Sequence, residues 1–154
     1  MIRLSFIKIL PESSDKLDSL KGWNKLSEAQ KILAEHKGVV FALDDGESIK
    51  AASVIVFDMG DEVLTTALRK LYLADLYADM ETESEYKGMM LEYTVNQAAY
   101  MGYDNMSVIV KSSNLTTLKF LAYHGFDKII RVDEKNGDVV LQRNVKTVMK
   151  CCGK

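Results

Sequence analysis

The chain has 154 residues, of which 47% are hydrophobic and 27% are charged, and its formal net charge at pH 7 is −2. This size and composition predict one soluble globular domain with a hydrophobic core of its own, and the small net charge gives no indication of a nucleic-acid or anionic-membrane partner. Because no apolar run is long enough to span a bilayer and the first residues lack the apolar block of a signal peptide, we expect a cytoplasmic protein.

The first part of the chain predicts a strand followed by two helices. Apolar and polar residues alternate within Ile2–Leu10, which is typical of a strand, and the only proline of the chain ends it. Two helical stretches are expected next: the first has Leu17 and Leu20 on one face, and the second runs from about Leu26 to His36. Trp23 lies between them, and we expect it either in the core or lining a substrate groove.

Two strands and a hairpin turn are expected after this pair of helices. Gly38 should end the second helix, because glycine commonly closes helices. The apolar segments Val39–Leu43 and Ile49–Phe57 predict two strands, and the turn signal Asp44-Asp45-Gly46 joins them as a hairpin. A further turn is predicted at Asp58–Asp61.

The middle of the chain predicts a buried strand that leads through a loop into a helix. Residues Ala67–Ala78 are nearly all apolar, which indicates a central strand buried on both faces. An acidic loop follows, and we expect the helix to begin after Gly88 and to end at Gly102. Such a loop can hold an anion, because the free N–H groups and the dipole of the helix face it.

The last part of the chain predicts a strand, a short helix and a hairpin. Met106–Val110 is the strand, and Asn114 is a good N-cap for a helix over Leu115–His124. Two final strands are expected at Asp127–Asp133 and Asp138–Asn144, joined by an Asn-Gly pair that is the strongest short hairpin signal in the sequence.

The predicted order is therefore strand, two helices, three strands, helix, strand, helix and two strands. The strand–helix–strand unit in the middle requires a parallel crossover, whereas the early strands form an antiparallel meander. The class is mixed α/β, with one domain over residues 1–145 and a tail over 146–154. We expect no metal at Cys151-Cys152 in this tail, because the only histidines, His36 and His124, do not lie at ligand spacing from it.

This order resembles the GNAT N-acetyltransferase superfamily, and the resemblance is most specific over residues 71–126. The segment Leu73–Asp79 is similar to the family's central strand, and the helix after it ends in the family's usual Gly-Tyr pair, here Gly102-Tyr103. A strand over Ser107–Lys111 follows, and then a short helix that starts at Asn114 and ends in Gly-Phe. The resemblance implies a GNAT fold, acetyl-CoA as co-substrate and an amine as acyl acceptor.

The acidic loop departs from the family's phosphate-binding pattern Q/R-x-x-G-x-G/A. Aligned without a gap, the pattern keeps Gly88, but Glu83 replaces the Arg or Gln and Tyr86 replaces the first glycine. A second alignment places Lys87 at the cationic position. Tyrosine in a left-handed conformation would cost about 1–2 kcal/mol, and a glutamate about 4 Å from a phosphate charge would cost roughly 4 kcal/mol at an effective dielectric of about 20. Outward-facing glutamates would instead stabilise the helix N-terminus.

Two residues are candidates for the acid and the base of an acyl transfer. The tyrosine with which the family protonates the departing thiolate falls on Leu121, so that Tyr123, next to His124, is either a displaced acid or a surface residue. Asp75 is the candidate general base, because an unpaired carboxylate in an otherwise apolar strand would be costly. It is either a groove-facing functional residue or a partnered structural one.

The resemblance also implies where acetyl-CoA would lie. The binding candidates are Leu76, Tyr77, Ala78, Tyr86, Lys87, Gly88, Met89 and Asn114. The first three would lie along the thioester, the next four would hold the pyrophosphate, and the last would contact the pantetheine arm. Tyr72 and Tyr77, on either side of Asp75, would line an acceptor site or belong to the core.

The sequence thus predicts an N-acyltransferase that moves an acetyl group from acetyl-CoA to a small-molecule or peptide amine, with no metal, nucleic-acid or membrane partner. The alternative is a GNAT-fold module that has lost catalysis and serves binding or regulation, which the altered loop and Leu121 favour. The sequence indicates neither a particular acceptor nor an oligomeric state.

Overall fold

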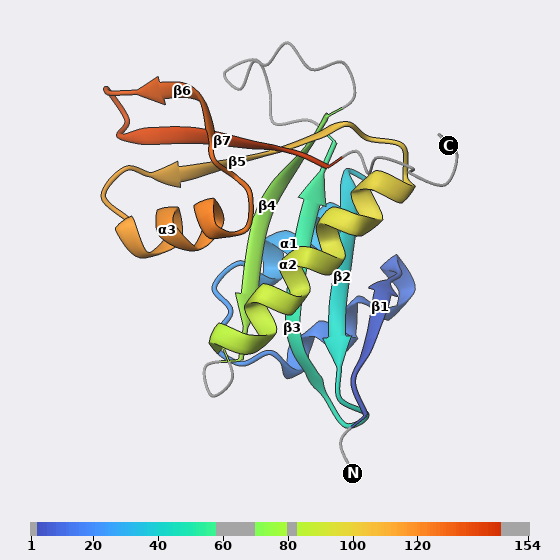
Figure 1. The fold of residues 1–154 in the computed structure, drawn as a ribbon. Helices are drawn as coiled ribbons and strands as arrows, with labels where there is room; N and C mark the ends of the chain where they lie inside the picture. The colour runs from blue at the N-terminus through green and yellow to red at the C-terminus, as the bar shows by residue number, and fades with distance from the viewer. Residues whose placement is uncertain (1–2, 58–69, 80–82, 146–154) are drawn as a thin grey trace, which may run out of the picture.

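The computed structural model describes residues 3–57, 70–79 and 83–145. In chain order (Figure 1), the elements are β1 (Ser5–Ile9), the 3-10 helix η1 (Pro11–Ser19), α1 (Leu26–Ala34), β2 (Gly38–Asp44), β3 (Ile49–Val56), β4 (Lys70–Ala78), α2 (Glu83–Tyr100), β5 (Asn105–Lys111), α3 (Leu115–Tyr123), β6 (Lys128–Asp133) and β7 (Asp138–Asn144). This order agrees with the prediction. The turn predicted at Asp58–Asp61, the start of the strand predicted from Ala67, and the tail with Cys151-Cys152 lie outside the described residues.

The described strands form one seven-stranded mixed sheet in the order β1-β2-β3-β4-β5-β7-β6. Neighbouring strands pair antiparallel except β4 and β5, which are parallel and joined by the crossover through α2. The mixed α/β class and the predicted parallel crossover are thus confirmed. Within the described residues β4 and β5 share three paired positions, Lys70–Tyr72 opposite Asn105–Ser107.

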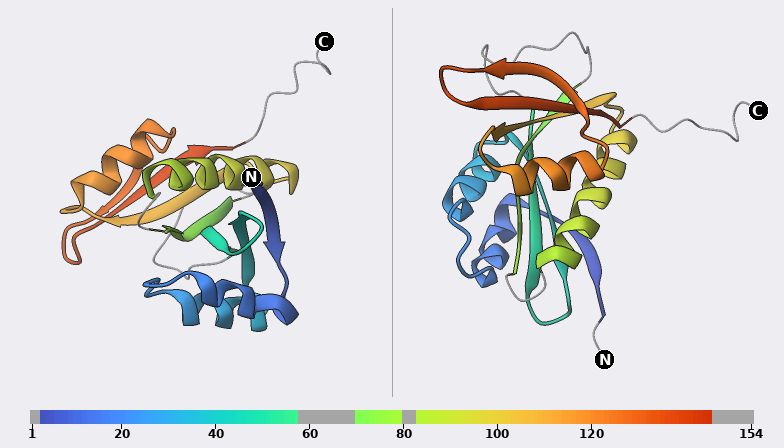
Figure 2. Two further views of the ribbon diagram at one scale, coloured as in Figure 1. Left: turned by 90° about the horizontal axis from the view of Figure 1, so that it is seen from below. Right: turned by 60° about the vertical axis from the view of Figure 1, so that its left-hand side comes forward.

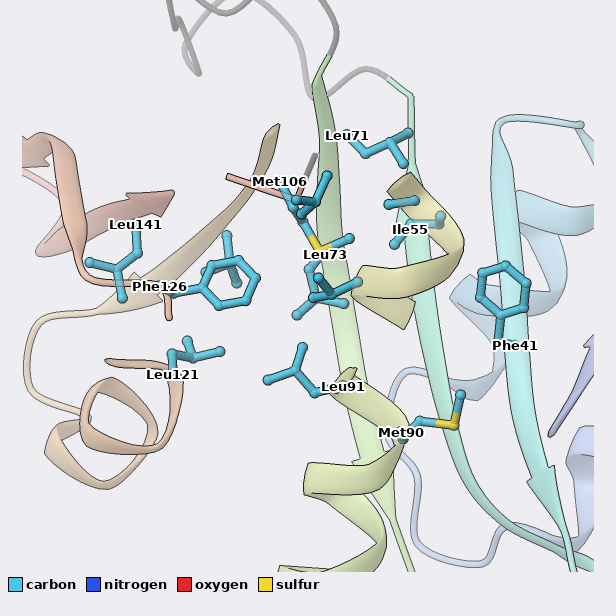
Figure 3. Close-up of a cluster of buried hydrophobic side chains, with 14 of the residues drawn as sticks. Phe41, Ile55, Leu71, Leu73, Met90, Leu91, Met106, Leu121, Phe126 and Leu141 are labelled. Atoms are coloured by element: carbon cyan, nitrogen blue, oxygen red, sulfur yellow. The ribbon is translucent and has the colours of Figure 1, made fainter. Parts of the chain in front are cut away.

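Helices cover both faces of this sheet. Figure 2 shows α2 and α3 on one side and η1 with α1 on the other. Each face has its own cluster of buried side chains, and the larger one lies under α2 and α3 (Figure 3), where Leu73, Leu91, Met106, Leu121 and Phe126 meet. The smaller cluster lies under η1 and α1 and contains Trp23. Trp23 is therefore a core residue, which is one of the two expectations for it.

A β-bulge in β4 determines which face each of its side chains occupies. Val54 of β3 lies opposite Asp75 and Ile55 lies opposite Leu73, so Ala74 is an extra residue without a partner in β3. Side chains alternate in a strand, and a bulge shifts this alternation by one residue. Leu73 therefore joins the cluster under α2, whereas Asp75 faces Trp23 on the α1 side.

The helix after β4 begins earlier than the sequence-based prediction placed it. α2 starts at Glu83, so Tyr86, Lys87 and Gly88 lie within its first two turns. The prediction of a loop up to Gly88 is wrong, and neither Tyr86 nor Gly88 has a positive φ. Glutamate is a good helix former and favourable near a helix N-terminus, which explains the earlier start.

The end of α1 also differs from the prediction. His36, not Gly38, is the left-handed residue after the helix, with φ of 55°. The N–H of His36 donates to the carbonyl of Leu33 and the N–H of Lys37 donates to that of Ile32, which is the Schellman pattern. Gly38 is needed for another reason, since a Cβ there would lie 2.1 Å from the carbonyl oxygen of Ile55.

Candidate functional site

A cleft opens where β4 and β5 separate. Beyond Tyr72 and Ser107 the two strands no longer pair and run apart (Figure 1). The space between them is a cavity of about 270 Å³, walled by β4, β5, α2 and α3. Among the described residues, no strand pairs with the backbone groups of β4 and β5 that face this opening, so these groups are available to an extended ligand.

Asp75 lies at the wall of this cleft and is held by a residue far away in sequence. The indole Nε1 of Trp23 donates a hydrogen bond to Asp75 Oδ2 at 2.5 Å. Trp23 is 5% exposed, whereas Asp75 is half-buried. Asp75 also lines a second cavity, on the α1 side of the sheet, and Ala74 is the other residue common to both. Asp75 is therefore a partnered residue, as one of the two alternatives drawn from the sequence has it, and its side chain lies on the α1 face of β4.

The residues that follow Asp75 do not share one environment. Leu76 lines the cleft. Tyr77 points to the other face, where its hydroxyl donates to the carbonyl of Lys21 at 2.7 Å and its ring stacks on Trp23 at a centroid distance of 5.8 Å. Ala78 is buried in the cluster under α2. Of these three candidates, only the side chain of Leu76 faces the cleft.

Two polar candidates line the cleft from the helices. Lys87 of α2 places its Nζ 5.8 Å from the ring centroid of Phe120, which also lines the cleft. Asn114 lies at the start of α3 and accepts a hydrogen bond from the N–H of Thr117 at 3.1 Å, so the predicted N-cap is confirmed. Tyr86 and Met89 pack partly buried against the core, and a Cβ on Gly88 would lie 3.4 Å from His124 Nε2.

The structure does not bring Tyr123 to the cleft. Its side chain is 86% exposed and borders a different cavity, and its ring meets the ring of His124 edge-on. His124 is held by Glu92, whose Oε2 lies 2.7 Å from its Nδ1. Leu121, at the family's tyrosine position, lines the cleft and is part of the core (Figure 3). Of the two expectations for Tyr123, the position fits a surface residue.

Sequence reasoning missed the Trp23–Asp75 hydrogen bond and the cavity on the α1 side. An aspartate inside an apolar strand and a tryptophan between two helices are the signals that could have suggested a pair. In the described part of the chain, no group of three or more His, Cys, Asp or Glu side chains could hold a metal ion. Among the same residues, no helix combines the length and the apolar character that crossing a membrane requires.

Comparison with solved structures places the fold. No protein-family sequence model matches the chain, and no curated protein sequence matches it. A putative GNAT acetyltransferase from Desulfovibrio desulfuricans matches with a TM-score of 0.71 at 13% identity, over 93% of this chain and 99% of that one. PaiA N-acetyltransferase from Thermoplasma acidophilum, in complex with coenzyme A, gives 0.67 at 13% identity over 92% and 99%. IAA acetyltransferase from Bacillus cereus gives 0.64 at 15% identity over 92% and 99%. The chain therefore has the fold of the GNAT N-acetyltransferases.

Proposed function

We propose that this protein is an N-acetyltransferase that transfers an acetyl group from acetyl-CoA to an amine of a small molecule or peptide. The observation that carries the proposal is the cleft between β4 and β5, with Asp75 in the strand that walls it and the Asp75 carboxylate held by Trp23 on the α1 face of that strand. Support also comes from the solved structures that share the fold, since they are named as acetyltransferases and one contains coenzyme A.

The residues around the cleft fit an elongated ligand with an anionic end. The unpaired backbone edges of β4 and β5 suit a pantetheine arm, which contains amide groups and can bind as an added strand does. The thioester carbonyl would accept a hydrogen bond from the backbone of Leu76–Ala78, and Asn114 would contact the arm. Lys87 and Lys111 both line the cleft. The ammonium group of Lys111 forms an ion pair with Asp138, with 2.9 Å between Nζ and Oδ1.

The helical start of α2 changes which groups would hold the pyrophosphate. In a helix that begins at Glu83, the backbone N–H groups of Lys87, Gly88 and Met89 donate within the helix. The N–H groups of Glu83, Ser84 and Glu85 are the ones without an intrahelical acceptor, and they face an anion together with the helix dipole. We therefore assign the pyrophosphate to the first turn of α2 and the side chain of Lys87.

In the proposed reaction, the amine nitrogen attacks the thioester carbonyl carbon and the carbon–sulfur bond breaks. Asp75, oriented by Trp23, accepts the proton that the amine loses. Among the described residues that line the cleft none is a tyrosine, so the departing thiolate takes its proton from water. A free thiol has a pKa near 8.5, so this step needs no strong acid at neutral pH.

A second candidate function is a GNAT-fold module that binds a ligand without catalysis. The specific observations in its favour are the position of Leu121 in the cleft and the exposure of Tyr123. In this case Asp75 and Trp23 form a structural pair alone, and the cleft binds coenzyme A or a similar molecule without acyl transfer.

Titration calorimetry with acetyl-CoA, followed by a thiol-release assay with a panel of amines, tests the proposal. We expect a dissociation constant in the micromolar range, and we expect Lys87→Gln to weaken binding about fivefold, which corresponds to one partly exposed charge contact. Lys119→Gln is the matched control, because Lys119 lies on α3 outside the cleft lining. No heat at millimolar acetyl-CoA would refute the transferase, and binding without thiol release from any amine would favour the non-catalytic module.

A further inference from the structure

The cavity on the α1 side reaches Asp75 from the face opposite the cleft's helices. Its volume is about 330 Å³. Its apolar part is formed by two residues of α1 and two of β3, namely Ala29, Ile32, Val54 and Val56. Because Ala74 and Asp75 line both cavities, the two cavities adjoin at this point of β4.

The two ends of this cavity carry opposite charges. Asp75 pairs with Val54 in the sheet, so its carboxylate marks one end. Lys37 marks the other end, because the N–H of Phe57, just after β3, donates to the Lys37 carbonyl at 3.2 Å. Val54 and Val56 are two strand residues apart, which separates the ends by roughly 7 Å of backbone.

The other charged residues of the cavity leave this polarity in place. Lys25 and Glu28, at the first turn of α1, neutralise each other at 3.4 Å. Lys37 is paired at 3.0 Å with Glu35, which does not line the cavity, and its side chain is 68% exposed. Exposed ion pairs contribute about 0–1 kcal/mol, so a ligand carboxylate can replace Glu35 as the partner of Lys37.

We infer that the acceptor is an amino acid-like molecule, with a primary amine at one end of an apolar body and a carboxylate at the other, bound in the α1-side cavity. The amine lies at Asp75, the body lies on the four apolar side chains, and the carboxylate lies at Lys37. This inference rests on the proposed function for its acyl transfer, but its binding geometry can be tested separately.

The test compares 6-aminohexanoate with hexylamine, which has the same amine and aliphatic body but no carboxylate. Both are assayed with the full chain as acyl acceptors in the presence of acetyl-CoA and, by calorimetry, as ligands. We expect 6-aminohexanoate to be favoured about fivefold in kcat/KM and in affinity. Lys37→Gln should remove this preference by lowering the affinity and kcat/KM for 6-aminohexanoate, and Lys37→Glu should reverse it.

Lys31→Gln is the matched control, because Lys31 is an exposed lysine of α1 outside the cavity lining. It should leave the preference unchanged. Equal or better binding of hexylamine by the unmodified protein, or a preference that persists in Lys37→Gln, would overturn the inference. Binding that depends on Lys37 supports the inference even without acetyl transfer, and the absence of transfer then counts against the proposed function alone.

Discussion

The hydrogen bond between Trp23 and Asp75 can be measured by a double-mutant cycle. Trp23→Phe removes the indole donor but keeps an aromatic ring, and Asp75→Ala removes the acceptor. Each single substitution also changes packing, so neither alone reports the bond. The difference between the double variant and the sum of the single variants isolates the pairwise interaction free energy.

The structure sets the expected size of this interaction. A hydrogen bond to a charged group contributes about 1.5–3 kcal/mol to stability. The bond here is 2.5 Å long and its donor is buried, which favours a strong interaction, but Asp75 is half-buried and partly solvated. We therefore expect an interaction of about 1.5–2 kcal/mol, near the lower end of that range.

Urea unfolding followed by far-UV circular dichroism is the suitable assay. Trp23 is the only tryptophan of the chain, so tryptophan fluorescence would be lost in half of the variants. Trp23→Phe combined with Asp138→Ala, on β7, is the control cycle and should be additive within about 0.5 kcal/mol. An interaction at Trp23–Asp75 no larger than that of the control would show that the bond does not hold Asp75, and the role of Trp23 in the mechanism would be lost.

Two further predictions concern local structure. His36→Gly should raise the free energy of unfolding by about 0.5–1 kcal/mol. Glycine removes the strain of the left-handed backbone at this position, and the greater entropy of glycine in the unfolded chain offsets part of that gain. His36→Ala keeps the strain and should give no such gain in the same urea assay. The backbone N–H groups of Ser48 and Glu47 lower the pKa of Asp45 in the folded protein below its ordinary value of 3.8. The ionised Asp45 side chain therefore stabilises the fold fully above pH 3.8, and this stabilisation is lost as the pH falls through the lowered pKa of the folded protein. The difference in unfolding free energy between the unmodified protein and Asp45→Ala should accordingly shrink below about pH 3.8, and a difference that is independent of pH down to about pH 2.5 would contradict this assignment.

Local sequence signals predicted the parts of the fold that local interactions determine. The cap at Asn114 needs one side chain and one N–H three residues away, and it is found where the sequence places it. The start of α2 was misplaced because the family resemblance suggested a loop, while the residues from Glu83 to Lys87 themselves favour a helix and one internal glycine costs only about 1 kcal/mol.

The candidate site depends on interactions that a local pattern does not contain. Trp23 and Asp75 are 52 residues apart in sequence, and their contact exists because the bulge at Ala74 turns Asp75 toward α1. The cavity between Asp75 and Lys37 likewise needs the register of β3 and β4. A single sequence identified Asp75 as unusual, but its partner and its two cavities follow only from tertiary structure.

The three shared positions of β4 and β5 also divide the sheet mechanically. Strands β1–β4 and strands β5–β7 are two half-sheets whose described backbone hydrogen-bond contact is limited to one end, at Lys70–Tyr72. The halves are joined mainly by side chains, since Leu73 and Leu91 meet Leu121 and Phe126 across the junction (Figure 3). Hydrophobic packing is less directional than a β ladder, so the spacing between the half-sheets is a property of the core. Substitutions at Leu91 or Phe126, which belong to that core but do not line the cleft, would change the width of the cleft without touching its lining.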